Sequence, residues 1–476
     1  MKALEEICAD LQNVRTAWRW AVAQGKVAEI TRAAPVLWLF YEMRNLFEEG
    51  EQAFSRAVAM LEARTGQGVE VDTALGMALA FQGRFAGRLY RYQDAAQLFR
   101  KSQVLLRRLG TQRDVALANT LLFYPGAEDS FPEIEQLLEE TLAIYRSLGD
   151  RWGIAFALTR FLWLTGTASA LSRDAEALQE SLAIGREIGD QSIVGLCLFQ
   201  LGVILQSSGA YREAKLRYQE SLAVFRELGD RRLAQMCLDH AGYVARALGE
   251  YEEARRYHLE SLTICREVGD RLGTAGSLSN LGLVARDLGD YVEAEQYLQE
   301  GLAIRTEVGH QWSIAISLEY LGDVALAQGN CGAARRWYQE SLEVSGGSQL
   351  PKQLPEALRG LGEVSSAEGE FEQARQLFRE ALELEMAWQV VYIPLILEIL
   401  VAVAELAARM GETQKAAEWL AYVAGQAGIT AQTRDKANRL LDELVSQLLP
   451  QAMAAARQRY SGGTLDEIVQ AILQEL

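Results

Sequence analysis

The segments SLAIGREIGD at 181–190, SLAVFRELGD at 221–230, SLTICREVGD at 261–270 and GLAIRTEVGH at 301–310 are copies of one pattern. Each copy begins 40 residues after the one before it, and TLAIYRSLGD at 141–150 extends the series upstream. Weaker copies begin at Ser341 and Ala381. A fixed period of this length predicts a stack of supersecondary units, each of which buries its apolar face against its neighbours.

The columns of this repeat predict two amphipathic helices in each unit. Apolar and small residues recur at spacings of three and four within each half, which is typical of helical faces. Glycine and alanine columns let two helices approach closely, and bulky residues stand beside them. The columns are Leu158, Leu198, Leu238, Leu278, Leu318 and Leu358; Gly202, Gly242, Gly282, Gly322 and Gly362; Ala214, Ala254, Ala294, Ala334 and Ala374; and the bulky Tyr218, His258, Leu298, Tyr338 and Phe378.

Glycines also mark the expected turns. One set lies in the middle of each unit, where glycine accepts the left-handed conformation that ends a helix. A second set, such as Gly189-Asp190, ends the second helix, and its aspartate can cap the helix that follows. The sequence therefore predicts helix, tight turn, helix, tight turn, with helices of roughly 15–18 residues. The mid-unit glycines are Gly209, Gly249, Gly289, Gly329 and Gly369.

This spacing resembles the tetratricopeptide repeat signature in at least five consecutive units, and the period resembles the extended class of such repeats. In one unit the matching residues are Leu198, Leu201, Gly202, Ala214, Tyr218 and Ser221. The resemblance implies an all-α fold, a right-handed superhelix (α-α solenoid). We expect the superhelix over 66–425, an N-terminal helical cap of degenerate repeats over 1–65 and a C-terminal helical cap over 426–476.

A wider resemblance covers nearly the whole chain. The opening LQNVRTAWRWAVAQG (11–25), the repeats and the ending AMAAARQRYSGGTLDEIVQAIL (452–473) are together similar to the C-terminal sensor region of bacterial STAND-type NTPases and MalT-like transcriptional regulators. That resemblance implies a sensor, an autoinhibitory surface or an oligomerisation platform, with an NTPase module of the same parent protein as one partner. Since the chain lacks a G-x-x-x-x-G-K-[ST] loop, NTP hydrolysis is not implied. The chain is then either a fragment of a larger regulator or a stand-alone repeat protein, and its abrupt start inside a helical pattern makes us expect a fragment.

Composition argues against several other classes. The chain of 476 residues has a net charge of −17, which disfavours direct nucleic-acid binding. No apolar run long enough to cross a membrane is present. The five cysteines form no C-x-x-C pair, so we expect no disulfide framework and a reducing, cytoplasmic location. No catalytic motif, metal-ligand spacing or cofactor motif occurs, and we predict a protein that is not an enzyme and needs no cofactor.

Two of the three histidines, His240 and His258, lie 18 residues apart among several carboxylates and invite a metal or acid/base interpretation. The repeat register separates them. His258 occupies the bulky column that packs inside a unit, whereas His240 lies on the first helix, two residues before Gly242. We therefore expect one packing residue and one recognition residue. Cys197 and Cys237 share a column in adjacent units and are expected to be small buried hydrophobes.

First helices line the concave side of such arrays, so positions around the Leu-Gly pair are expected to form a partner-binding groove. These positions vary between units while the packing columns stay nearly fixed. They mix aromatic, amide and charged groups, which suits a protein or peptide segment. The predicted groove residues are Thr159, Arg160, Trp163, Phe199, Gln200, Val203, Asp239, His240, Tyr243, Arg246, Ser279, Asn280, Leu283, Arg286, Glu319, Tyr320, Asp323, Arg359 and Glu363.

The sequence thus predicts a non-catalytic recognition and scaffolding module that acts as a sensor or regulatory region. Three alternatives stay open at this point. One is a small-molecule effector sensor with a pocket near Trp163, Phe199 and Tyr243; another is an enzyme that uses His240 or His258. The third is a homo-oligomerisation platform, in which the partner is a second copy of the chain.

Overall fold

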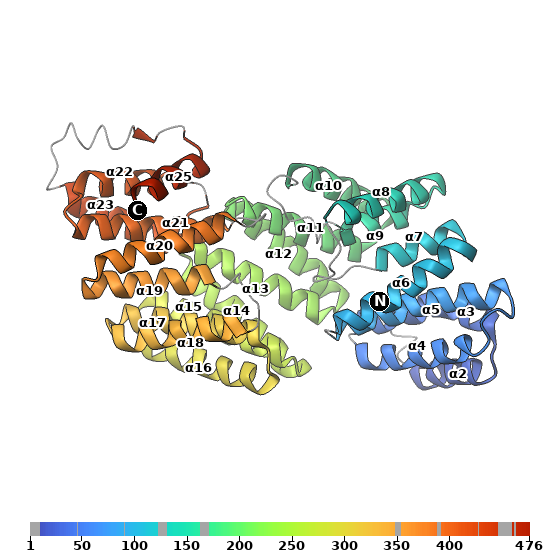
Figure 1. The fold of residues 1–476 in the computed structure, drawn as a ribbon. Helices are drawn as coiled ribbons and strands as arrows, with labels where there is room; N and C mark the ends of the chain where they lie inside the picture. The colour runs from blue at the N-terminus through green and yellow to red at the C-terminus, as the bar shows by residue number, and fades with distance from the viewer. Residues whose placement is uncertain are drawn as a thin grey trace. The chain divides into compact units, whose positions relative to one another are not determined.

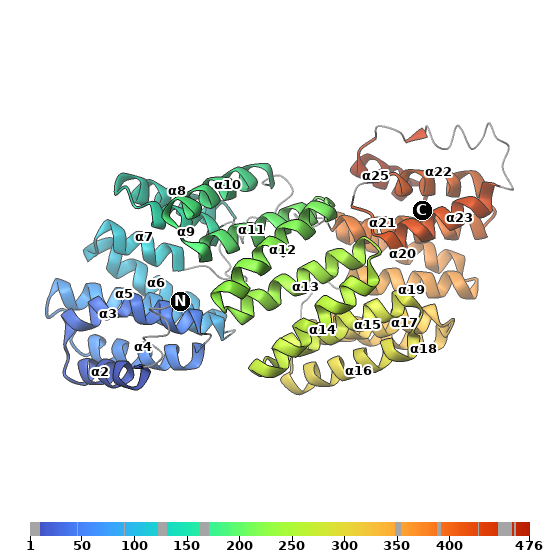
Figure 2. The same cartoon turned by 180° about the vertical axis from the view of Figure 1, so that it is seen from behind.

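The protein is represented by a computed structural model (Figure 1, and from behind in Figure 2). Its described residues are all helical or lie in short connections, and they contain no strand. The described ranges are 10–44, 46–89, 91–121, 131–161, 171–347, 354–387, 392–426, 428–445, 459–460 and 463–476.

Helices follow one another through short connections along the described chain. The first are α2 (Leu11–Ala23), α3 (Val27–Met43), α4 (Phe47–Glu62), α5 (Val69–Arg88), α6 (Tyr92–Leu109), α7 (Gln112–Leu121), α8 (Phe131–Ser147), α9 (Arg151–Phe161), α10 (Leu171–Ile188), α11 (Gln191–Ser207) and α12 (Tyr211–Leu228). The others are α13 (Arg231–Ala247), α14 (Tyr251–Val268), α15 (Arg271–Leu288), α16 (Tyr291–Val308), α17 (Gln311–Ala327), α18 (Cys331–Gly347), α19 (Leu354–Glu368), α20 (Phe371–Met386), α21 (Ile393–Arg409), α22 (Thr413–Ala424), α23 (Ala431–Val445) and α25 (Leu465–Glu475).

The chain forms two compact units. Unit 1 comprises Met1–Leu201 and Ala223–Arg232, and unit 2 comprises Gly202–Leu222 and Leu233–Leu476. The 40-residue repeat continues across the boundary between the two units, and the repeat pattern alone does not predict this division. In the repeat region, helices such as α13, α14, α15 and α16 are 17 or 18 residues long, which confirms the predicted length.

Each unit has two layers of helices. Sequential helices pack as pairs, such as α15 with α16 and α17 with α18. Within unit 2, α17 also contacts α15 and α19, and α21 contacts α19 and α23, so the odd-numbered helices form a continuous layer. In unit 1, α5 contacts α3 and α7, which repeats the arrangement. These odd-numbered helices are the first helices of the predicted units.

The glycine and bulky columns pack against each other within each helix pair, as predicted. A Cβ atom placed on Gly322 would lie 2.6 Å from the ring of Tyr338, and one on Gly242 would lie 2.5 Å from the ring of His258. Such distances are shorter than van der Waals contact, so only glycine allows these helices to approach so closely. His258 is 1% exposed, and its role as a packing residue is confirmed.

The turns follow the glycine signals. Gly289 has φ of 87° and Gly329 has φ of 75°, both in the left-handed region where a side chain is strained. Asp270 caps α15 by accepting a hydrogen bond from the backbone N–H of Gly273 at 2.8 Å, which confirms the predicted Gly-Asp stop and start.

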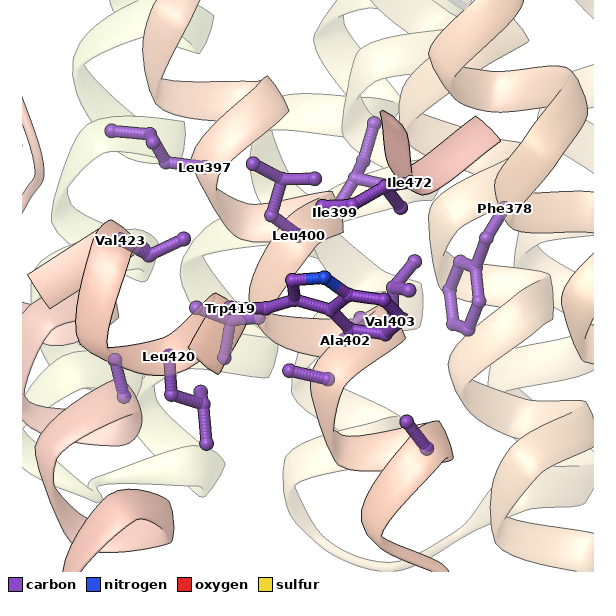
Figure 3. Packing of buried hydrophobic residues seen from close by; sticks show 14 of the residues in the cluster. Phe378, Leu397, Ile399, Leu400, Ala402, Val403, Trp419, Leu420, Val423 and Ile472 are labelled. Carbon is purple, nitrogen blue, oxygen red and sulfur yellow. The ribbon is translucent and has the colours of Figure 1, made fainter. Parts of the chain in front are cut away.

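The last helices bury a large apolar core. Trp419 of α22 lies among aliphatic side chains of α21, including Leu400, while Phe378 of α20 and Ile472 of α25 lie nearby (Figure 3). α25 starts with a capping box, in which the Thr464 side chain accepts from the Glu467 N–H and Glu467 accepts from the Thr464 N–H. α25 therefore packs against the same apolar core as α20, α21 and α22.

Candidate functional site

The odd-numbered helices of unit 2 enclose a cavity of about 750 Å³. Helices α15, α17, α19, α21 and α23 supply most of its lining, and α14, α16, α18 and α20 each add one residue. Five cationic and six carboxylate side chains line it, so the cavity is strongly polar and its charges are nearly matched. Each odd-numbered helix among these supplies at least one of the charges: Arg286, Asp323, Arg359, Glu398 and Lys436, in chain order.

The lining charges form a connected series of ion pairs. Asp323 lies 2.9 Å from a guanidinium nitrogen of Arg286 and 2.9 Å from one of Arg359. Arg359 also pairs with Glu363, which lies 2.9 Å from the ammonium group of Lys436. The Tyr338 hydroxyl donates to Asp323 at 2.7 Å. Charges from three neighbouring repeats and from α23 are thus held in one network.

Burial and pairing act in opposite directions on these groups. Burial by itself would raise the pKa of Asp323, but the adjacent Arg359 and Arg286 lower it below its ordinary value. Burial likewise opposes the charge of Lys436, but Glu363 and Glu405 outweigh it and raise the pKa. Both groups are therefore charged at neutral pH, and each depends on its partners to remain charged.

Three glutamates of unit 2 have raised pKa values, in contrast to Asp323. Burial raises the pKa of Glu319, and the neighbouring Glu356 raises it further. The pKa of Glu356 is also raised, first by burial, and the two side chains share a hydrogen bond. Ser341 donates to Glu319 at 2.9 Å. Burial also raises the pKa of Glu398 on the cavity wall. These carboxyl groups retain protons at higher pH than exposed glutamates do.

Three hydrogen bonds join early and late helices of unit 2, and the one between Arg286 and Gln432 lies in the cavity lining. Each bond joins residues that are at least 146 positions apart in the sequence. It therefore depends on the folding of all the repeats between them. The pairs are Tyr243 and Tyr392 (2.6 Å between hydroxyl oxygens), Arg286 and Gln432 (3.0 Å), and Tyr211 and the carbonyl oxygen of Gly428 (2.8 Å).

Five of the predicted groove residues come together in this network. They are Arg246, which pairs with Asp287 at 2.9 Å, and Arg286, Asp323, Arg359 and Glu363. Six further predicted residues of unit 2 are half-buried: Val203, Asp239, His240, Tyr243, Asn280 and Tyr320. The Nδ1 atom of His240 lies 3.2 Å from the side-chain oxygen of Gln206, and burial lowers the pKa of the imidazole.

Other predicted groove residues lie inside the packing. Six are buried, namely Thr159, Phe199, Gln200, Ser279, Leu283 and Glu319. Gln200, for example, donates from its side chain to the backbone carbonyl of Thr159 at 2.5 Å. Since these side chains offer almost no surface to a partner, we leave them out of the proposed binding surface. Trp163 lies outside the described residues.

Arg160 belongs to unit 1 and has a different setting. It lies 3.4 Å from Glu42, whose same carboxylate oxygen is 2.6 Å from Arg84 and 3.2 Å from Arg88. Burial, followed by the charge of Arg84, lowers the pKa of Arg160 to about 9. Arg160 is therefore part of an internal charge cluster on the odd-numbered helices of unit 1.

Glu398, Glu405 and Lys436 line the cavity but were not among the predicted residues. The reason is a change of period. After Gly369 the corresponding turn glycine is Gly411, which is 42 residues later, so counting in forties misses the last unit. A count of 42 places Glu405 in the column of Asp323 and Glu363. That signal is present in the sequence.

Two buried cysteines occupy the same column in adjacent repeats. Cys197 and Cys237 are buried, and their sulfur atoms lie 3.2 Å from the hydroxyls of Ser181 and Ser221 respectively. Burial raises the pKa of Cys197 to about 12, which disfavours the thiolate. Within the part of the chain that the structure describes, no group of three or more His, Cys, Asp or Glu side chains is arranged to hold a metal ion.

A second, smaller pocket lies in unit 1. Its volume is about 460 Å³, and it is formed by α2 and α4 together with Tyr41 near the end of α3. Trp18 and Val22 of α2 and Ala53 of α4 form its apolar lining. None of the described helices is both long and apolar enough to cross a membrane.

The sequence matches a family model described as tetratricopeptide repeat over residues 234–307, 277–347 and 313–387. These ranges cover α13 to α20 and therefore much of the helical layer that lines the cavity of unit 2. A search of curated proteins finds no match. Repeats of this type are associated with protein-interaction or sensor roles.

Solved structures agree with this fold. A Rap protein complexed with Competence and Sporulation Factor is 13% identical, with 90% of this chain and 100% of that chain covered and a TM-score of 0.52. The apo form of RapI is 18% identical (60% and 99% covered, TM-score 0.47). A signal transduction ATPase with numerous domains and a tetratricopeptide repeat sensor, from Pyrococcus horikoshii, is 15% identical (71% and 53% covered, TM-score 0.48).

At this level of identity the likeness to the Rap protein establishes the fold and nothing further. Together with the family match and the helix pairs of both units, it shows an all-α solenoid, and residues 234–387 within it are a tetratricopeptide-type repeat region.

Proposed function

We propose that the chain is a recognition and scaffolding module without catalytic activity, and that the cavity of unit 2 binds a peptide segment of a partner protein. The observation that supports this most is the convergence of Arg286, Asp323, Arg359 and Glu363, from three successive first helices, on one cavity of about 750 Å³. The sequence predicts all four as variable groove positions.

The size and polarity of the cavity favour a short peptide. Its volume lies in the range of about 300–1,000 Å³ that suits ligands of modest size, so a few residues fit and a folded domain does not. Small-molecule sites are mostly apolar, whereas five cations and six carboxylates line this one. The acidic side chains of such a peptide can pair with the lining arginines and lysine, and its basic side chains can pair with the lining carboxylates. A peptide that carries both signs therefore leaves no lining charge unpaired.

Binding of this kind is selective because it must compete with existing ion pairs. A ligand of one charge sign would satisfy Asp323 or Arg359 but leave the other without its partner. Uncompensated charges in a half-buried site are costly, so ligands of matched charge are preferred.

We also propose the biological setting that the sequence resemblance implies. The chain would be the sensor or regulatory region of a bacterial signalling NTPase or transcriptional regulator, in the cytoplasm, with an NTPase module as a partner. Peptide binding would change the curvature of the repeat stack or relieve contacts with that module. An NTPase module encoded upstream in the same reading frame supports this setting, and an unrelated upstream sequence counts against it.

The proposed cavity is tested by filling it. Ala327 is exposed on the cavity wall, and Ala303 is exposed on α16 outside the lining, so Ala327→Trp and Ala303→Trp are a matched pair. Peptides selected from a random display library on the full chain should combine acidic and basic residues. Ala327→Trp should weaken their binding about tenfold or more in calorimetry, equivalent to ~1.4 kcal/mol, while Ala303→Trp leaves it unchanged.

Other outcomes identify the rival functions. Equal binding to both variants would show that the peptides bind elsewhere. A metabolite that binds with stoichiometry, and that Ala327→Trp excludes, would support the small-molecule sensor. Growth of the scattering mass with concentration would support the homo-oligomerisation platform. Turnover of a substrate that is lost on His240→Ala would support an enzyme.

A further inference from the structure

The pocket of unit 1 differs in composition from the cavity of unit 2. It has a volume of about 460 Å³, which is within the range of small-molecule sites, and it lies between two adjacent helices of one unit. Trp18 supplies an apolar wall and is 6% exposed. Its indole N–H donates to the carbonyl of Ala53 at 3.2 Å, so its polar edge is already satisfied within the protein. Only a small part of its ring faces the pocket, and that part is apolar.

One ion pair at the pocket is complete. The Nε atom of Arg15 donates to Glu49 at 2.5 Å, and a second nitrogen of Arg15 contacts the other carboxylate oxygen. The hydroxyl of Tyr41 also donates to Glu49, at 3.2 Å. Among the described residues that line the pocket, Glu49 is the only acidic one, and both of its oxygens are engaged by Arg15.

Two further arginines line the same pocket. Arg19 follows Arg15 by four residues on α2, and Arg56 lies on α4. Like charges four residues apart repel on a helix surface. Among the described residues, neither Arg19 nor Arg56 forms an ion pair. Three guanidinium groups thus surround one carboxylate, in a chain whose net charge is −17.

We propose that this pocket binds a small organic oxyanion, a carboxylate or phosphate group carried on an apolar body. The oxyanion would pair with Arg19 and Arg56, since planar guanidinium groups match carboxylate and phosphate oxygens. The apolar body would contact the exposed Ala23 and the small parts of Trp18 and Val22 that face the pocket. Such a ligand supplies the negative charge that the lining lacks and covers the apolar wall, and it uses residues separate from the peptide-binding cavity.

The probes are phenyl phosphate and benzoate, each titrated into the full chain by calorimetry. Benzyl alcohol has the apolar body without the charge, and inorganic phosphate has the charge without the body. At least one of the two aromatic anions should bind at least about tenfold more tightly than either partial probe. Binding of phenyl phosphate alone would point to phosphate esters as the natural ligands, and binding of benzoate alone would point to carboxylic acids.

Variants at exposed positions keep the test independent of folding. Arg56→Gln should weaken binding of the aromatic anion about tenfold, because it removes one charge-assisted contact. Arg32→Gln removes an exposed arginine from α3 outside the pocket and should have no effect. The proposal is overturned if neither aromatic anion binds below about 10 mM, if benzyl alcohol binds equally well, or if Arg56→Gln and Arg32→Gln behave alike.

Discussion

The cavity of unit 2 and the pocket of unit 1 use charge in opposite ways. In unit 2, Asp323 and Glu363 each have two basic partners, and the lining as a whole is nearly balanced. In unit 1, Arg19 and Arg56 line a pocket whose single glutamate is already paired with Arg15. In the balanced lining of unit 2, a charged ligand must replace existing ion-pair partners. In the unbalanced lining of unit 1, an anionic ligand pairs with arginines that have no ion-pair partner among the described residues.

This difference assigns the two sets of charged residues different roles, in stability for unit 2 and in ligand binding for unit 1. Ion pairs that lie half-buried in unit 2 hold neighbouring units together, so breaking them should destabilise the fold. Exposed arginines in unit 1 contribute little to stability, so changing them should alter binding and leave the fold intact. Substitutions in the two regions should therefore give different signatures, and the following predictions are ordered from the largest effect to the smallest.

Removal of one carboxylate from the unit 2 network should be severe. Asp323→Ala leaves Arg286 and Arg359 without their shared partner, and the side chain of Arg359 is only 12% exposed. The free energy of unfolding should fall by about 3–5 kcal/mol, as is typical when one member of a buried pair is removed. The measurement is urea unfolding followed by helical circular dichroism.

The matched control for Asp323→Ala is Glu300→Ala. Glu300 pairs with Arg266 at 2.9 Å on the surface, where both side chains are about half exposed. Its loss should cost about 1 kcal/mol or less. Similar losses for the two variants would contradict the structural role of the network.

The buried carboxyl pair of unit 2 should give a measurable dependence on pH. The pKa values of Glu319 and Glu356 are raised above the ordinary 4.5, so the folded chain keeps protons that the unfolded chain releases. Their contribution to stability is complete below pH 4.5 and is lost as the pH rises through the raised values. Each unit of raised pKa corresponds to about 1.4 kcal/mol.

Glu356→Gln should remove one of these titrations and flatten the profile. Urea midpoints measured between about pH 4.5 and pH 8 should fall less steeply for this variant than for the parent chain. Glu300→Gln, at an exposed pair, should leave the slope unchanged. Parallel profiles for all three proteins would show that the carboxyl pair has ordinary pKa values.

The smallest effect is expected at the one glutamate of the unit 1 pocket. Glu49→Gln frees Arg15 and adds one uncompensated positive charge, so an aromatic anion should bind roughly threefold more tightly. Added salt should reduce this gain, because exposed charges are screened. Weaker binding of the anion by this variant would argue against an oxyanion as the ligand. A fall in the free energy of unfolding well above ~1 kcal/mol would show that the Arg15–Glu49 ion pair stabilises the fold.

The fold was predictable because packing constraints repeat in every unit. Gly242 and Gly322 can be assigned a packing role from the sequence since the residue 16 positions later, His258 or Tyr338, must fill the space beside each of them. The same register predicted that His258 is a packing residue. The turns at Gly289 and Asp270 were also predictable, because each depends only on residues a few positions away in the sequence.

The site was less predictable because exposure depends on side-chain direction and on distant contacts. Ser279 and Glu319 occupy the expected columns but are buried. The contribution of Lys436 required knowing that α23 lies beside α21, which a repeat count does not give. The pocket of unit 1 was not found either, because α2 and α4 lack the regular signature and their pairing had no sequence signal.

Cross-linking tests the account most directly. A selected peptide with a photoreactive group would be bound to the full chain, irradiated and located by mass spectrometry. Attachment should occur at cavity residues of the odd-numbered helices, such as Ala327 and Ala367, and excess unlabelled peptide should prevent it. Attachment confined to α16 and α18, with Ala327→Trp without effect on it, would contradict recognition through the cavity of unit 2.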